Sequence, residues 1–128
     1  MRKSFVMLLV GMLANDLAYA QMIQLAKDDG LEISYKWEVG GNREQLLWIE
    51  ARNENDVAVD FELIIFMKRG AEVVESTGLS SLCIGAGKSL KPKTSGLIFE
   101  VKTPKSEIDS ILPGALNVVK ADRKDCHL

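Results

Sequence analysis

The feature of this chain that most restricts its fold is an alternation of apolar and polar side chains along short segments. It is clearest from Val57 to Met67, where every second residue is apolar. Residues 31–39 alternate in the same way, with Trp37 on the apolar side and charged or hydroxyl side chains on the other. A period of two residues is typical of a strand that buries one face against a core. No helical pattern continues for the roughly ten residues of an ordinary helix.

Turn-forming residues separate the alternating segments at intervals of roughly ten residues. We expect Trp37 and Phe61 to anchor the core, and Thr77-Gly78 to separate two short strands. Residues 106–112 fit a helical turn capped by Ser106. The pattern as a whole predicts an all-β domain, namely an antiparallel immunoglobulin-like β-sandwich of about seven strands.

The first twenty residues have the three parts of a secretory signal peptide. Arg2 and Lys3 form the positive end, and residues 5–13 form a short apolar run. Ala18-Tyr19-Ala20 then offers the small residues that a signal peptidase requires, which predicts cleavage before Gln21. The apolar run is shorter than the roughly 20 residues that span a bilayer, so an N-terminal anchor is the less favoured alternative.

The remaining residues, 21–128, have the length of a single β-sandwich domain. Acidic and basic residues are interspersed along them, without the basic stripe that nucleic-acid binding requires. We therefore expect no nucleic-acid partner. No second apolar segment is long enough to span a membrane, so we expect the mature chain to be exported to the periplasm or secreted.

Both cysteines, Cys83 and Cys126, lie in the exported part. An even number of cysteines in an oxidising compartment favours a disulfide. Such a bridge would stabilise a small domain by roughly 3–4 kcal/mol according to the chain-entropy model. Two free thiols and a bridge between chains remain alternatives.

The candidates for chemistry are few. His127 is the only histidine and follows Cys126 in a polar tail, where neither a catalytic base nor a zinc ligand is held rigidly. Asp60 and Glu62 share a strand face that we expect to be in water. Residues 85–89 are too closely spaced for a phosphate-binding loop. We therefore predict no catalytic residue, no cofactor and no metal, and hence no enzyme.

One apolar surface is a candidate partner-binding face. Ile64 and Phe66 lie on the polar side of the strongest strand, and Trp48 would lie beside them on a neighbouring strand. Exposed apolar patches often mark binding surfaces. The alternative is that the N-terminal segment or residues 103–114 cover this face and complete a core, because a small domain needs most of its apolar residues buried.

The stretch from Trp48 to Phe99 resembles the FxLYD-type and related immunoglobulin-like domains of bacterial envelope proteins. The similar pieces are residues 52–55, 57–67, Gly70 with Val73-Val74, and 84–89. Residues 65–68 lack the Tyr-Asp pair that names the family. The resemblance implies a non-enzymatic exported domain and assigns no functional residues.

The sequence therefore predicts an exported, non-enzymatic binding or structural module of the bacterial envelope, with a protein or glycan partner. The alternative is a secreted protein inhibitor of a hydrolase, in which a loop at residues 85–95, near Cys83, enters an active site. An exposed Trp48, Ile64 and Phe66 face favours the first function, whereas a protruding loop favours the second. A small hydrolase ranks last, because the chain offers no base and nucleophile. The partner and the oligomeric state stay open.

Overall fold

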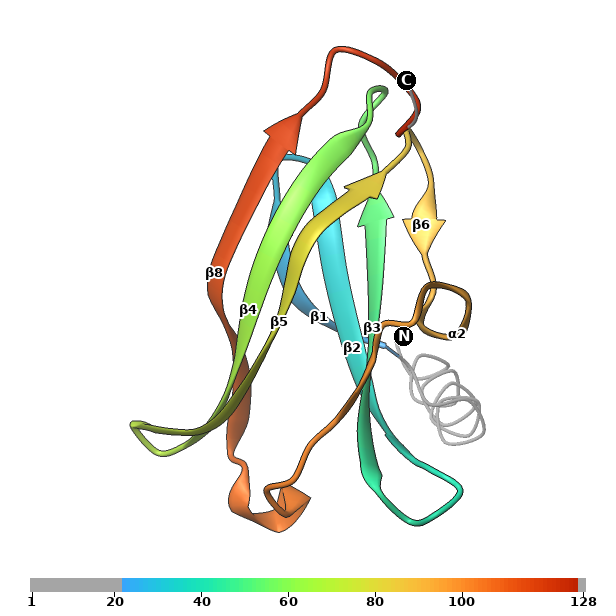
Figure 1. Cartoon of the computed structure of the whole chain (residues 1–128). Helices are drawn as coiled ribbons and strands as arrows, with labels where there is room; N and C mark the ends of the chain where they lie inside the picture. The colour runs from blue at the N-terminus through green and yellow to red at the C-terminus, as the bar shows by residue number, and fades with distance from the viewer. Residues whose placement is uncertain (1–21, 127–128) are drawn as a thin grey trace, which may run out of the picture.

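The computed structural model describes residues 22–126, over which the chain forms eight β-strands and two short helical turns (Figure 1). The predicted signal peptide, residues 1–20, and His127 lie outside the described residues. The prediction of an all-β domain is confirmed. No helix within residues 22–126 is long and apolar enough to cross a membrane.

The strands are β1 (Ile23–Asp28), β2 (Leu31–Val39), β3 (Gln45–Asn53), β4 (Val59–Arg69), β5 (Glu72–Ile84), β6 (Ser89–Leu90), β7 (Ile98–Glu100) and β8 (Ser110–Lys120). The helical turns are α2 (Pro92–Ser95) and η1 (Lys105–Glu107).

The strands form two antiparallel sheets that lie one in front of the other in Figure 1. Sheet A has the order β1-β2-β3-β6, and β7 also pairs with β3. Sheet B has the order β5-β4-β8. The segment between Asn53 and Val59 therefore carries the chain from one sheet to the other. Because of this crossing, β3 and β4 belong to different sheets and do not share an outer surface.

The core lies between the two sheets and contains most of the side chains that the alternation assigned to the interior of β2, β3 and β4. Phe61 is 2 % exposed and belongs to the core as predicted, whereas Trp37 is half-buried and packs against it. Burying one large apolar side chain contributes roughly 1.5–3 kcal/mol to stability, so the buried side chains of the core together dominate the stability of the fold. Its large members are Leu31, Ile33, Leu47, Ile49, Val59, Phe61, Leu63, Ile65, Met67 and Ile84.

Two segments differ from the sequence-based expectation. Residues 72–84 form one strand rather than two, because Gly78 stays in register opposite Ile64 and bulges on either side absorb the irregularity. Ser106 lies inside η1, whose N-cap is Pro104 and makes no side-chain capping bond. The expected helical turn is therefore shorter than residues 106–112, and β8 begins already at Ser110.

A buried polar residue holds together the upper end of the molecule as drawn in Figure 1. Asn53, at the end of β3, is fully buried. Its Oδ1 accepts hydrogen bonds from the backbone and side-chain nitrogens of Asn55, both at 3.0 Å. Its Nδ2 lies 2.9–3.1 Å from three backbone oxygens, those of Val57, Ile84 and Gly85. One amide thus ties β3 to the start of β4 and the end of β5.

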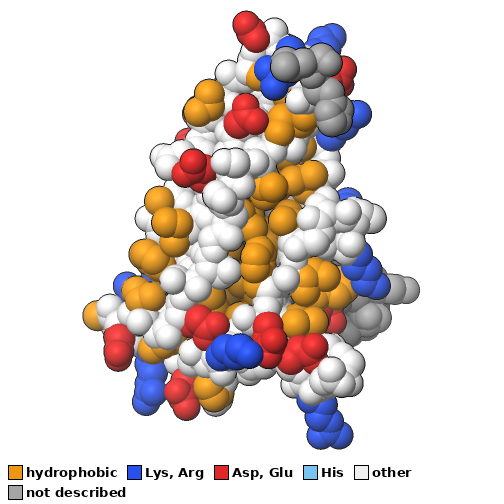
Figure 2. Space-filling view, in the orientation of Figure 1, with side chains coloured by type: hydrophobic (Ala, Val, Ile, Leu, Met, Phe, Trp, Pro, Cys, Tyr) orange, Lys and Arg blue, Asp and Glu red, His pale blue; other side chains and the backbone are white. Residues whose placement is uncertain are grey.

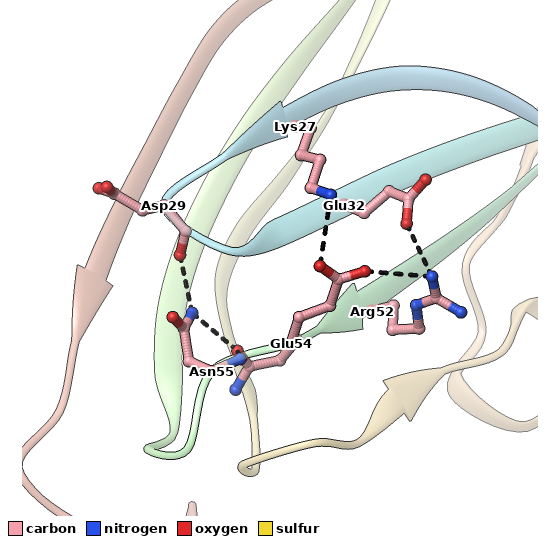
Figure 3. Close-up of polar contacts among 7 residues, drawn as sticks. Lys27, Asp29, Glu32, Arg52, Glu54 and Asn55 are labelled. Carbon is pink, nitrogen blue, oxygen red and sulfur yellow. Dashed lines mark hydrogen bonds and ion pairs between the residues drawn. The ribbon is translucent and has the colours of Figure 1, made fainter.

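A network of charged side chains lies on the surface beside this residue (Figure 3). The Arg52 guanidinium is 3.1 Å from carboxylate oxygens of both Glu32 and Glu54, and the Lys27 ammonium is 3.3 Å from Glu54. The hydrogen bond from Lys27 and that from Arg52 lower the pKa of Glu54, and the bond to Glu54 raises the pKa of Arg52. Figure 3 also shows Asn55 donating to the backbone oxygen of Asp29. The network fastens the β1–β2 turn to the end of β3.

A single carboxylate connects the two sheets on the β5 side. Glu75 is opposite the buried Met67 in the β4–β5 register, so its side chain lies on the inner side of sheet B. Its two oxygens accept hydrogen bonds from the backbone nitrogens of Lys102, at 3.0 Å, and Thr103, at 2.7 Å, which follow β7 of sheet A. Burial raises the pKa of Glu75, but these hydrogen bonds outweigh it and bring the pKa below its ordinary value.

Candidate functional site

The three residues predicted to form one apolar face do not lie together. Trp48 is on β3 of sheet A, whereas Ile64 and Phe66 are on β4 of sheet B. The expectation that β3 and β4 are neighbours is wrong, because the chain crosses between the sheets after Asn53. Trp48 pairs instead with Lys36 of β2 and Ile98 of β7. The structure therefore separates the predicted face into two surfaces on opposite sides of the molecule.

Trp48 is surrounded by neighbours on the outer side of sheet A. The ammonium groups of Lys36 and Lys93 lie 5.2 and 5.4 Å from its ring centroid, within the range of cation–π interactions. Its indole Nε1 is buried and has no hydrogen-bond acceptor among the described residues. Trp48 is therefore half-buried, with two lysine side chains beside its ring.

The outer side of sheet B carries an apolar patch across two neighbouring strands. Ile64 and Phe66 of β4 are directly opposite Ala115 and Leu112 of β8. Ile64 is 45 % exposed and Leu112 is 44 % exposed. We call these four residues, Ile64, Phe66, Leu112 and Ala115, the β4 face. The sequence did not identify Leu112 and Ala115 as candidates, because the register between β4 and β8 is not encoded in any local pattern.

The ring of Phe66 lies flat against β8. A Cβ atom built on Gly114 would be 2.7 Å from two ring carbons, so the ring occupies the space that a side chain there would need. Gly114 is also the extra residue of a bulge between the pairs Ile64–Ala115 and Ile65–Pro113. Glycine at this position therefore fixes where Phe66 lies on the β4 face.

Charged residues flank the β4 face along β4. Asp60 and Glu62 precede it on the same side of the strand, and Lys68 follows it. Beside the acidic residues is a shallow cavity of about 230 Å³ that Asn117 and Val119 of β8 also line. Asp60, Glu62 and Lys68 make no ion pair with another residue of the range 22–126.

Neither segment that was expected as a possible cover lies over the β4 face. The N-terminal part of the described chain forms β1 in sheet A, and residues 110–120 enter sheet B as β8. Figure 2 shows hydrophobic side chains exposed on the β8 side of the molecule, at the left of the view. The apolar patch is thus a surface and not part of a second core.

Both edge strands of sheet B carry features that hinder pairing with another strand. β5 contains two bulges, and Ser81 within it has a φ of 56°. β8 contains Pro113, which has no N–H to donate, and the bulge at Gly114. Prolines and bulges are common protections of exposed sheet edges. The sheet is therefore better suited to contact a partner through its face than through an edge.

The predicted disulfide is confirmed. Cys83, near the end of β5, is bonded to Cys126, with their Cα atoms 5.8 Å apart. The segment before Cys126 is also held by backbone hydrogen bonds from Ala58 to Arg123, at 2.7 Å, and from Ala86 to Lys124, at 2.9 Å. A cavity of about 720 Å³ lies beside the bridge and is lined by Ile84, Lys88, Leu90, Asp125 and both cysteines.

Residues 85–95, the candidate inhibitory loop, are bound to the body of the molecule. Their first part hydrogen-bonds to the C-terminal segment, and the Lys88 oxygen accepts from the Asn53 nitrogen at 2.9 Å. β6 then pairs with β3, and Pro92 at the start of α2 is buried. Residues 85–92 are therefore held against the body of the molecule, whereas Lys93, Thr94 and Ser95 of α2 are exposed.

The described residues offer few groups for chemistry. No group of three or more His, Cys, Asp or Glu side chains within residues 22–126 is placed to hold a metal ion. Asp60 and Glu62 lie on the exposed side of β4, as expected.

No family model matches the chain, and no curated protein or solved structure is significantly similar to it.

Proposed function

We propose that this protein is an exported, non-enzymatic binding module of the bacterial envelope and that it contacts a protein partner through the β4 face. The observation that carries the proposal is the exposure of Ile64 and Leu112 beside Phe66 on one side of sheet B. A small domain gains stability by burying such residues, so leaving them in water is costly unless a partner covers them.

The chemistry of the face favours a protein over a glycan. Ile64, Leu112 and Ala115 are aliphatic and offer no hydrogen bonds to sugar hydroxyls. The only aromatic ring among them, that of Phe66, is half-buried against Gly114. An apolar centre with a polar rim is the usual composition of a protein–protein contact.

Export and the finer fold class belong to the same proposal. The signal peptide predicted at residues 1–20 and the Cys83–Cys126 disulfide both suit an oxidising compartment, the periplasm or the exterior. Two antiparallel sheets with a shared core support an immunoglobulin-like sandwich, in line with the resemblance to FxLYD-type domains. Mass spectrometry of the exported product is expected to give a chain that begins at Gln21.

The test is to compare partner capture by a variant of the β4 face with capture by a matched control. The double variant Ile64→Ser/Leu112→Ser removes two exposed apolar side chains, and Val39→Ser removes one that is 74 % exposed at the end of β2, in sheet A. A polypeptide captured from envelope extract is identified, purified and tested for binding to each form. We expect the double variant to lose binding by at least about tenfold, and Val39→Ser to keep it. Equal binding by all three forms would rule out the β4 face.

A further inference from the structure

Five side chains on the outer side of β4 form a row that is acidic at one end, apolar in the middle and basic at the other end. Asp60, Glu62, Ile64, Phe66 and Lys68 are alternate residues of one strand, so they share a side and follow one another at about 7 Å. The row begins with two carboxylates, continues with two apolar side chains and ends with an ammonium group. Such a row is complementary to a copy of itself that runs in the opposite direction.

We infer that the partner of the β4 face is a second copy of this chain, bound face to face about a twofold axis. The inference rests on the proposed function and names its partner. The axis passes between Ile64 and Phe66, parallel to the sheets and across the strands. Each Ile64 then lies opposite the partner's Phe66, and each Glu62 lies opposite the partner's Lys68. A contact of this kind is isologous, the usual arrangement of homodimers.

The neighbouring strands fit the same axis. On β8, Leu112 is level with Phe66 and Ala115 is level with Ile64, so the axis places Leu112 opposite the partner's Ala115. On β5, the residues at the same two levels are Ser76 and Gly78, and neither has a bulky side chain that would keep the sheets apart. Apolar groups thus meet apolar groups on β4 and β8, and no bulky side chain blocks the approach on β5.

The charges at the two ends of the row favour a second copy of the chain over an anionic membrane surface. Glu62 and Lys68 have no ion-pair partner in the described part of the chain, so both are available to pair across the axis. An anionic membrane surface attracts patches surrounded by Lys and Arg, whereas Asp60 and Glu62 would be repelled by it. Pairing with a reversed copy brings Glu62 of each molecule opposite Lys68 of the other.

The size of the face sets the strength of the contact. Three strands about 4.8 Å apart, each contributing about nine residues, present an area of roughly 400 Å² on each molecule. Interfaces of this size belong to the small class that associates weakly and reversibly. We therefore expect a dimer that forms at micromolar to millimolar concentrations.

The experiment is sedimentation equilibrium on the product of the full 128-residue chain, from about 10 µM to about 1 mM. The weight-average mass is expected to rise towards that of two chains. Glu62→Lys and Lys68→Glu each place like charges opposite one another, and each is expected to raise the dissociation constant at least about tenfold. The double variant Glu62→Lys/Lys68→Glu restores opposite charges and should restore the dimer. Lys124→Glu, an exposed charge reversal outside sheet B, is the control and should leave association unchanged.

A wild-type chain that stays monomeric at about 1 mM would overturn the inference. A dimer that both single reversals leave intact would also overturn it, because the contact would then lie elsewhere. The double reversal keeps the test informative if a single variant folds poorly, as judged by circular dichroism. A monomer that still loses a purified envelope partner on Ile64→Ser/Leu112→Ser would overturn only the second copy as partner and leave the proposed function standing.

Discussion

Asn53 is the one fully buried polar side chain among residues 22–126. Five hydrogen-bonding groups converge on its amide from the start of β4, the end of β5 and the turn after β3. Buried polar groups are costly unless they are paired. The main effect of Asn53 on stability is therefore that it supplies hydrogen-bond partners to backbone groups that would otherwise be buried without any.

Replacing this amide is expected to destabilise the protein strongly. Asn53→Ala leaves the oxygens of Val57, Ile84 and Gly85 without their donor, and we expect the free energy of unfolding to fall by about 3 kcal/mol. Urea denaturation measures this change. The exposed Asn42→Ala is the control and should change stability by less than about 0.5 kcal/mol. Equal effects of the two substitutions would contradict the role assigned to Asn53.

The Glu75 carboxylate makes stability depend on acid pH. Its pKa is lowered in the folded protein, so its contribution is complete above the ordinary glutamate pKa and disappears as the pH falls through the lowered value. Glu75→Gln should therefore be slightly less stable than the wild type at pH 7, by under about 1 kcal/mol because the carboxylate is only partly buried and water screens its interactions. Its thermal unfolding midpoint should also depend less on pH below the ordinary value. Identical pH profiles for both proteins would contradict this.

At the scale of elements, the two glycines within sheet B have different surroundings. Gly78 of β5 has only ordinary contacts at the position of a Cβ, the nearest being the Leu63 oxygen at 3.4 Å, and its φ is not positive. Gly114 of β8 has the Phe66 ring at 2.7 Å. The first glycine is tolerated within its strand, whereas the second is required by the packing of a neighbour.

The pair Gly114→Ala and Gly78→Ala tests this difference. Gly114→Ala forces the Phe66 ring to move and should cost about 1 kcal/mol, with a change in the Phe66 ring signals in an NMR spectrum. Gly78→Ala should leave stability unchanged or raise it by up to about 1 kcal/mol, because alanine restricts the unfolded chain. Unchanged Phe66 signals in Gly114→Ala would show that the ring does not lie against Gly114.

The alternation predicted which residues of β2, β3 and β4 are buried, because side chains of a strand must point to opposite sides. It did not predict which strands are neighbours. Consecutive strands usually pair, and on that basis Trp48 was expected beside Ile64. The short crossing after Asn53 reversed this expectation and split the candidate site. No alternation of apolar and polar residues marks β1, because this edge strand buries few side chains and Ile23 at its start is exposed.

At the scale of the whole molecule, the Cys83–Cys126 bridge connects segments that are 43 residues apart in the chain. A bridge across a loop of this length removes much conformational freedom from the unfolded chain. It also holds the segment after β8 against the end of β5. The bridge and the Asn53 hydrogen bonds stabilise the same end of the two sheets.

Removing the bridge is expected to lower stability without changing the fold. By the chain-entropy model, Cys83→Ala/Cys126→Ala should lose about 4 kcal/mol in urea denaturation. The backbone hydrogen bonds of Arg123 and Lys124 stay in place, so the far-ultraviolet circular dichroism should remain that of a β protein. Adding a reductant should destabilise the wild type by a similar amount and leave the variant unaffected. A loss below about 1 kcal/mol would contradict the chain-entropy account.

The position of β4 between β5 and β8 affects how the newly synthesised chain folds. One neighbour of β4 follows it immediately, but the residues of the other are roughly 40–60 positions further along the chain. During synthesis, the β8 side of β4 stays exposed, with unpaired backbone hydrogen-bonding groups, until the residues of β8 have been made. Folding dominated by such distant pairings is slow, and exposed strands of this kind aggregate. A chaperone that holds this strand until β8 arrives would therefore raise the yield of the protein.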